Sequence, residues 1–144
     1  MIDSTALANA VEKWRERQFA SGDLNRGVDC VNLLLGLYEE IGFVMPVEFE
    51  GVTREDYANL YQTDRPKANE IWNRFLMSLG TEIGKENFAR GDILILKAEG
   101  SNELSMAIAL GNGSALVVTE RLGCKVIPVR VIKRFFYSVR RLCQ

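Results

Sequence analysis

The spacing of apolar residues changes along this chain of 144 residues, and that change limits the folds open to it. In the first two thirds, apolar residues recur every three or four positions, which is the period of an amphipathic helix. In the final third they form short runs separated by turn residues, which is typical of strands. Helices followed by an antiparallel sheet predict an α+β fold, with N-terminal helices packed on a C-terminal sheet.

Four helices are expected, over the ranges 3–19, 29–41, 53–61 and 66–79. Each range starts with a residue that favours the first turn of a helix: Asp3 or Ser4, Asp29, Thr53 and Pro66. Neither a repeat nor a low-complexity tract nor a linker interrupts the chain, so residues 1–144 are expected to form a single domain.

Five strands are expected in the final third, over the ranges 93–97, 104–110, 114–119, 124–129 and 135–139. The sequence Gly111-Asn112-Gly113 separates the second and third of these runs. Asn-Gly between two apolar runs is a strong signal for a tight hairpin turn, so these two strands should pair directly.

Histidine is absent from the chain, so no imidazole can serve as base, acid or metal ligand. The three cysteines, Cys30, Cys124 and Cys143, include no C-x-x-C pair, and an odd number argues against a disulfide framework. We therefore expect neither a metal nor a cofactor. No apolar run approaches the ~20 residues that cross a bilayer, and no signal peptide is visible.

Cys30 is the residue with the clearest chemical meaning, because it lies in the first turn of an expected helix. Free backbone N–H groups and partial positive charge at a helix N-terminus stabilise a thiolate, and the same groups can stabilise a neighbouring oxyanion. The alternative interpretation is a small buried side chain near a helix start. On position alone, this second interpretation is the favoured one.

Two segments carry a family resemblance. Residues 26–30, Arg-Gly-Val-Asp-Cys, resemble the nucleophile motif of the NlpC/P60 family, and residues 91–96 and 107–113 resemble its Gly-Asp strand and its hairpin. The resemblance implies a papain-like α+β fold and a family that typically cleaves peptide bonds in bacterial peptidoglycan. The chain looks most similar to short, phage tail-associated members.

The chain departs from this family at the residues that move protons. In the alignment the family's catalytic histidine falls at Ser105, and its third polar residue falls near Val117. A serine hydroxyl does not take up a proton at neutral pH, and valine forms no hydrogen bond. Loss of acid–base assistance alone costs roughly 10²- to 10⁴-fold in rate. Glu103 could approach Cys30, but a nearby carboxylate raises a thiol pKa, and Lys97 is a poor acid.

The main hypothesis is an inactive NlpC/P60-like domain that is a structural or binding part of a phage tail or prophage-derived assembly. Expected partners are other virion or tail proteins or a peptidoglycan peptide, and expected locations are the bacterial cytoplasm during assembly or the virion tail. A cysteine peptidase or amidase with a non-histidine base is the competing hypothesis. A third is a binding module that uses the basic C-terminal strands, although nucleic acid is an improbable partner. In all cases Cys30 should face the strand that carries Ser105.

Overall fold

The computed structural model describes residues 2–18 and 29–143. Within them lie four α-helices: α1 (Ser4–Trp14), α2 (Cys30–Glu40), α3 (Arg54–Thr63) and α4 (Arg65–Ser78). A small antiparallel hairpin is formed by β1 (Glu48–Phe49) and β2 (Val52–Thr53). Three short 3-10 helices follow: η1 (Lys85–Asn87), η2 (Val129–Val131) and η3 (Lys133–Phe135).

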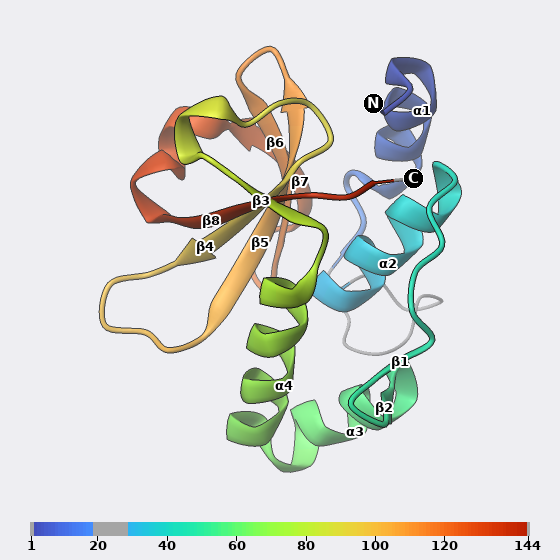
Figure 1. Ribbon diagram of the computed structural model, residues 1–144, viewed down its shortest axis with the longest axis vertical. Helices are drawn as coiled ribbons and strands as arrows, with labels where there is room; N and C mark the ends of the chain where they lie inside the picture. The colour runs from blue at the N-terminus through green and yellow to red at the C-terminus, as the bar shows by residue number, and fades with distance from the viewer. Residues whose placement is uncertain (1, 19–28, 144) are drawn as a thin grey trace.

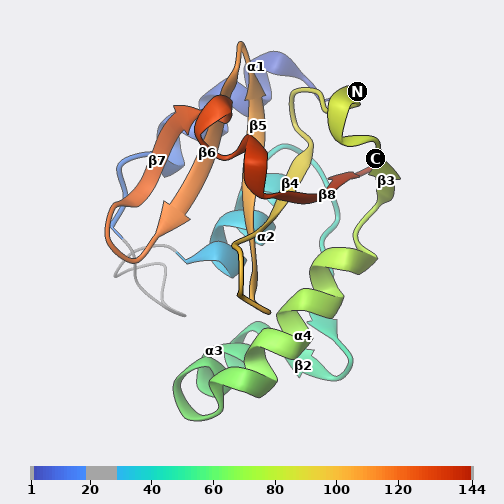
Figure 2. The same cartoon turned by 90° about the vertical axis from the view of Figure 1, so that its left-hand side faces the viewer.

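A six-stranded antiparallel sheet forms the second half of the described residues, in the order β3-β8-β4-β5-β6-β7. Its strands are β3 (Thr81–Ile83), β4 (Ile93–Lys97), β5 (Leu104–Gly111), β6 (Ser114–Thr119), β7 (Gly123–Pro128) and β8 (Phe136–Arg141). Helices α1 and α2 lie against one face of this sheet, whereas α3 and α4 lie toward one end of it (Figures 1 and 2). The predicted α+β fold, helices packed on an antiparallel sheet, is confirmed.

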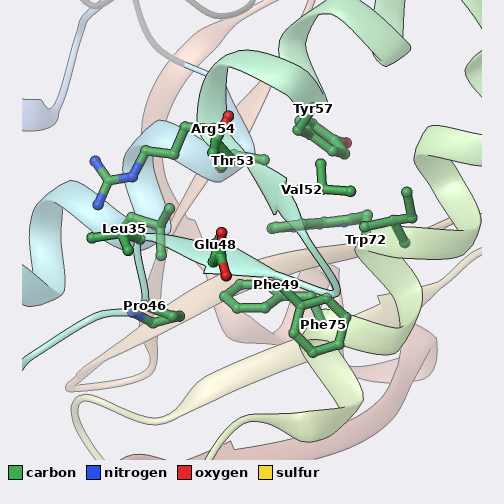
Figure 3. Close-up of a pocket in the computed structure, with 13 residues that line it drawn as sticks. Leu35, Pro46, Glu48, Phe49, Val52, Thr53, Arg54, Tyr57, Trp72 and Phe75 are labelled. Atoms are coloured by element: carbon green, nitrogen blue, oxygen red, sulfur yellow. The ribbon is translucent and has the colours of Figure 1, made fainter.

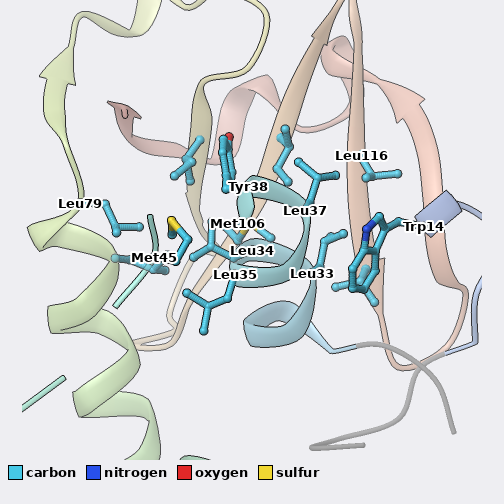
Figure 4. Close-up of a cluster of buried hydrophobic side chains, with 14 of the residues drawn as sticks. Trp14, Leu33, Leu34, Leu35, Leu37, Tyr38, Met45, Leu79, Met106 and Leu116 are labelled. Carbon is cyan, nitrogen blue, oxygen red and sulfur yellow. The ribbon is translucent and has the colours of Figure 1, made fainter. Parts of the chain in front are cut away.

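The sheet buries side chains on both faces, and the two-residue alternation of each strand sorts them. On β4, Ile93 and Ile95 face the core under the helices, whereas Leu94 and Leu96 face a second core beside η2 and η3. Helix α2 is buried along most of its length against the first core (Figure 4). Both faces of the sheet are therefore fixed by packing, which also fixes the strand register.

The turn before β4 ties three distant elements together. Asp92, only 2% exposed, accepts two hydrogen bonds of 2.8 Å from the guanidinium of Arg141 on β8. It also accepts one from the backbone N–H of Ala89. The hydroxyl of Tyr38 on α2 donates to the carbonyl of Gly91, at 2.6 Å. The Gly-Asp pair noted in the sequence therefore anchors α2 and β8 to β4.

Several boundaries differ from the prediction. The first helix ends at Trp14 rather than at residue 19, because the following segment pairs with β7. The N–H of Glu16 donates to the carbonyl of Cys124, and the N–H of Cys124 donates to the carbonyl of Arg17, both at 2.7 Å. Strands β1, β2 and β3 have only two or three residues each and were not predicted. The other helices and strands agree to within two residues.

Gly36 allows α1 and α2 to pack closely. A Cβ built on Gly36 would lie 2.6 and 2.7 Å from two ring carbons of Trp14, whose indole N–H donates to Glu40. Alanine is a better helix former than glycine by about 1 kcal/mol, but overpacking a buried contact costs about 1–3 kcal/mol. The steric penalty should exceed the gain in helix propensity.

We therefore expect Gly36→Ala to lower the free energy of unfolding by about 1 kcal/mol or more. Urea denaturation of Gly36→Ala, of Trp14→Phe and of the double variant measures this. Because phenylalanine lacks the indole's fused ring, the Gly36→Ala penalty should shrink in the Trp14→Phe background. A stabilised Gly36→Ala protein would contradict the close contact.

Candidate functional site

Helix α2 begins in a buried environment. Asp29 is its N-cap: the carboxylate accepts the backbone N–H of Asn32 at 2.7 Å, and only 8% of the residue is exposed. Cys30 follows as the first residue of the helix. The predicted position of Cys30 at a helix N-terminus is therefore confirmed.

The thiol of Cys30 points toward the sheet. Its Sγ lies 4.0 Å from the carbonyl oxygen of Val118 on β6, 88 positions along the chain. The residue is partly exposed and lines a pocket. Cys30 therefore lies between the start of α2 and the end of β6.

Cys30 lines a pocket with a cavity of about 60 Å³. Tyr57 and Tyr61 of α3 contribute two phenol rings to this pocket. Trp72 of α4 contributes an indole, and Glu103, directly before β5, contributes a carboxylate. The indole N–H of Trp72 donates to the carbonyl of Leu104 at 2.9 Å, which fixes α4 against β5. The Tyr61 hydroxyl donates to Glu120, beyond β6, at 3.1 Å, so α3 spans the mouth of the pocket.

Of the other predicted site residues, the structure brings one to this pocket. Ser105 lines it together with Cys30 and is exposed. Val117 does not line it: its side chain belongs to the second core, on the sheet face opposite the helices. The adjacent Val118 is the residue whose side chain packs under the helices. Because side chains alternate along a strand, a shift of one residue exchanges the two faces.

The two side chains considered as substitutes for histidine separate in space. Glu103 lines the cysteine pocket, as its proximity in sequence to Ser105 suggested. Lys97 instead lies in a different pocket, with its Nζ 5.5 Å from the ring centre of Tyr137. Lysine therefore offers the thiol no direct assistance.

The electrostatics of the pocket oppose a thiolate. Burial first, and then the negative charges of Asp29 and Glu103, together raise the pKa of the Cys30 thiol to about 12. The helix N-terminus favours the thiolate, as expected from its position, but loss of water and two carboxylates act in the opposite direction. At neutral pH the sulfur carries its proton.

The two tyrosines of the pocket are also held neutral. Burial raises the pKa of Tyr57, and burial followed by its hydrogen bond to Glu120 raises the pKa of Tyr61 to about 12. Sequence analysis missed both, although their spacing of four residues on a helix was a usable signal. Trp72 is only 4% exposed and lines the pocket, so it belongs both to the core and to the pocket wall.

Solved structures with this fold include the NlpC/p60 domain of the peptidoglycan hydrolase SagA. That domain is 17% identical with a TM-score of 0.64, covering 98% of this chain and all of the domain. An NlpC/P60 family protein from Bacillus cereus is 15% identical with a TM-score of 0.65, covering 99% of this chain. The chain spans 41% of the length of that protein.

The P60 domain of an antigen from M. avium paratuberculosis is 19% identical, with a TM-score of 0.60, and covers 97% of this chain and 93% of that domain. The fold is therefore that of NlpC/P60 domains. A comparison with curated proteins finds no match. A family described as "Domain of unknown function (DUF6950)" matches residues 2–138.

A protonated, partly buried thiol should react slowly with alkylating agents. In a Cys143→Ser background, which removes the exposed thiol, we expect iodoacetamide to modify Cys30 at pH 8 at least about 100-fold more slowly than N-acetylcysteine. Glu103→Gln removes one of the charges that raise the thiol pKa and should accelerate the reaction, whereas Glu99→Gln on the exposed β4–β5 loop should not. Peptide mass spectrometry separates Cys30 from Cys124. Modification of Cys30 as fast as the free thiol would falsify this description of the site.

The raised thiol pKa also links stability to alkaline pH. An unfolded cysteine titrates near 8.5, so above that pH the folded protein retains a proton that the unfolded chain has lost. Loss of that proton favours the unfolded chain. The contribution of the Cys30 thiol to the free energy of unfolding is therefore complete below pH 8.5 and is lost progressively as pH rises toward 12. Cys30→Ala should therefore reduce the fall in unfolding free energy between pH 8.5 and 10 by about 2 kcal/mol, measured by urea denaturation. An equal slope in both proteins contradicts the assignment.

Proposed function

The chain belongs to the family described as "Domain of unknown function (DUF6950)", and we propose that it is an NlpC/P60-like domain without catalytic activity. Its role is that of a structural or binding component. The observation that carries the proposal is the composition of the cysteine pocket: the described residues that line it include carboxylates and phenols but no basic side chain.

Peptide cleavage by a thiol needs a base to form the thiolate and an acid to protonate the leaving amine. The chain has no histidine at all. Asp29 already caps α2, and both tyrosines stay neutral because their pKa values are raised. Ionising the Cys30 thiol at pH 7, five pH units below a pKa of about 12, costs about 7 kcal/mol. No other group described in the pocket offsets that penalty.

One observation favours the competing function, a cysteine peptidase or amidase on cell-wall peptides. Glu103 lines the same pocket as Cys30 and could accept a proton. Its charge, however, raises the thiol pKa, so the same carboxylate that would serve as base makes the nucleophile harder to ionise. The inactive role is therefore the better supported of the two.

A phage tail or prophage-derived assembly is the proposed setting, with residues 1–144 acting as one domain. Partners are then other virion or tail proteins, or a peptidoglycan peptide held without cleavage, in the bacterial cytoplasm during assembly or in the virion tail. The described helices include none with the length and apolar composition to cross a membrane. The resemblance to short tail-associated members of the family supports this setting.

Nucleic acid is not proposed as a partner, because, among the described residues, three of the seven cations from Arg121 onward pair with the protein's own acids. Arg141 binds Asp92, Lys133 pairs with Glu86 at 3.6 Å, and Lys125 pairs with Glu16. The basic segment is interpreted either as a solvated strand edge or as a set of contacts with the protein's own acidic half, and these pairs favour the second.

The purified chain should leave muropeptides intact. We expect product formation, followed by liquid chromatography and mass spectrometry, to be the same for the wild type and for Cys30→Ala. An active NlpC/P60 domain run in parallel shows that the substrate is cleavable. Turnover by the wild type that disappears in Cys30→Ala overturns the proposal and establishes the peptidase alternative.

A further inference from the structure

A second pocket encloses a cavity of about 50 Å³, and Figure 3 shows the residues that line it. Its walls are mainly apolar and come from α2, α4 and the β1–β2 hairpin. Phe49 of the hairpin meets Phe75 of α4 edge to face, with ring centres 5.3 Å apart, and Trp72 lies 6.1 Å from Phe75. Trp72 and Tyr57 line both pockets, so the two are neighbours that share a wall.

The hairpin that covers this pocket is held at both ends. The carboxylate of Glu50, in the turn of the hairpin, accepts three hydrogen bonds from the guanidinium of Arg74 on α4, at 2.8, 2.9 and 3.1 Å. Arg54, which follows β2, pairs with Glu39 of α2. The pocket is therefore formed before any ligand arrives, which reduces the entropy lost on binding.

The rim of the pocket combines apolar surface with one uncompensated charge. Val47 lines the pocket and is 81% exposed, and Val44 in the same segment is 98% exposed. Glu48 also lines the pocket, and it forms no ion pair with any residue in the ranges 2–18 and 29–143. By contrast, the neighbouring carboxylates of Glu39 and Glu50 are both neutralised by arginines.

We propose that this pocket binds a bulky apolar side chain of a partner peptide whose adjacent residue is lysine or arginine. The cavity is small, about 50 Å³, which suits the end of one apolar side chain rather than a long acyl chain. The apolar walls supply affinity through burial, and Glu48 supplies specificity for the neighbouring cation. This inference deepens the proposed binding role and rests on it.

Nuclear magnetic resonance of the two tryptophan indole N–H groups tests the proposal. Trp72 lines the pocket, whereas Trp14 is buried between α1 and α2 and serves as an internal control. We expect Ac-Phe-Lys-NH₂ to shift the Trp72 signal and not that of Trp14. Ac-Ala-Lys-NH₂ should bind at least fivefold more weakly, and Ac-Phe-Glu-NH₂ at least threefold more weakly.

Charge reversal supplies the matched controls. Glu48→Lys should invert the preference, so that Ac-Phe-Glu-NH₂ binds more tightly than Ac-Phe-Lys-NH₂, whereas Glu99→Lys should change nothing. Val52→Phe, which fills the pocket, should abolish the Trp72 shift while leaving the Trp14 signal in place. Cys30→Ser should leave binding unchanged, because the thiol lies outside this pocket.

Three results overturn the proposal: no peptide moves the Trp72 signal, octanoate binds more tightly than every peptide, or the signal moves on dilution alone because a second copy occupies the pocket. Muropeptide cleavage is not measured here. Failure of the peptide site therefore does not affect the proposal that the domain is inactive. Detection of muropeptide cleavage would likewise not affect the result of the peptide titrations.

Discussion

The burial of α2 is the constraint on which the site depends. Leu33, Leu34, Leu37 and Tyr38 are all fully buried, so this helix has apolar contacts on most of its circumference rather than on one stripe. Its position leaves no freedom for its first turn, which is pressed against β6 with the Asp29 cap already buried. The environment of Cys30 therefore follows from core packing.

Magnitudes explain why the position of Cys30 does not make it a nucleophile. A helix N-terminus stabilises a negative charge by about 0.3–1 kcal/mol, and up to about 2 kcal/mol in favourable partly buried sites. A thiol pKa that rises from its ordinary value near 8.5 to about 12 corresponds to about 5 kcal/mol against the thiolate. Desolvation and the adjacent carboxylates exceed the dipole severalfold. The same location in a chain with a cation or an imidazole beside the sulfur would give the opposite result.

The sequence predicts well what local chemistry decides. Asp29 marks the start of α2, and Asn112-Gly113 marks the turn between β5 and β6, whose bounds match the expectation at Ser114–Thr119. The sequence predicts poorly those features, such as helix ends and strand faces, that depend on residues far away in the chain. Nothing local indicates that the first helix ends at Trp14, because the cause is pairing with Cys124. The same holds for Val117, whose side chain faces away from the pocket. Side chains alternate along a strand, so an alignment shifted by one residue places the side chain on the wrong face of the sheet.

Helix α3, all of whose residues are described, buries no side chain, yet it completes the cysteine pocket. Such a helix is held by its capping box, by Tyr57 against Trp72 and by Tyr61 against Glu120, rather than by a core of its own. Elements with few buried contacts open at lower free energy than the rest of a fold. Tyr57 of α3 and Trp72 of α4 line both the cysteine pocket and the apolar pocket, so these two helices form a wall that the pockets share. A change in the position of α3 would therefore alter the shape of both pockets.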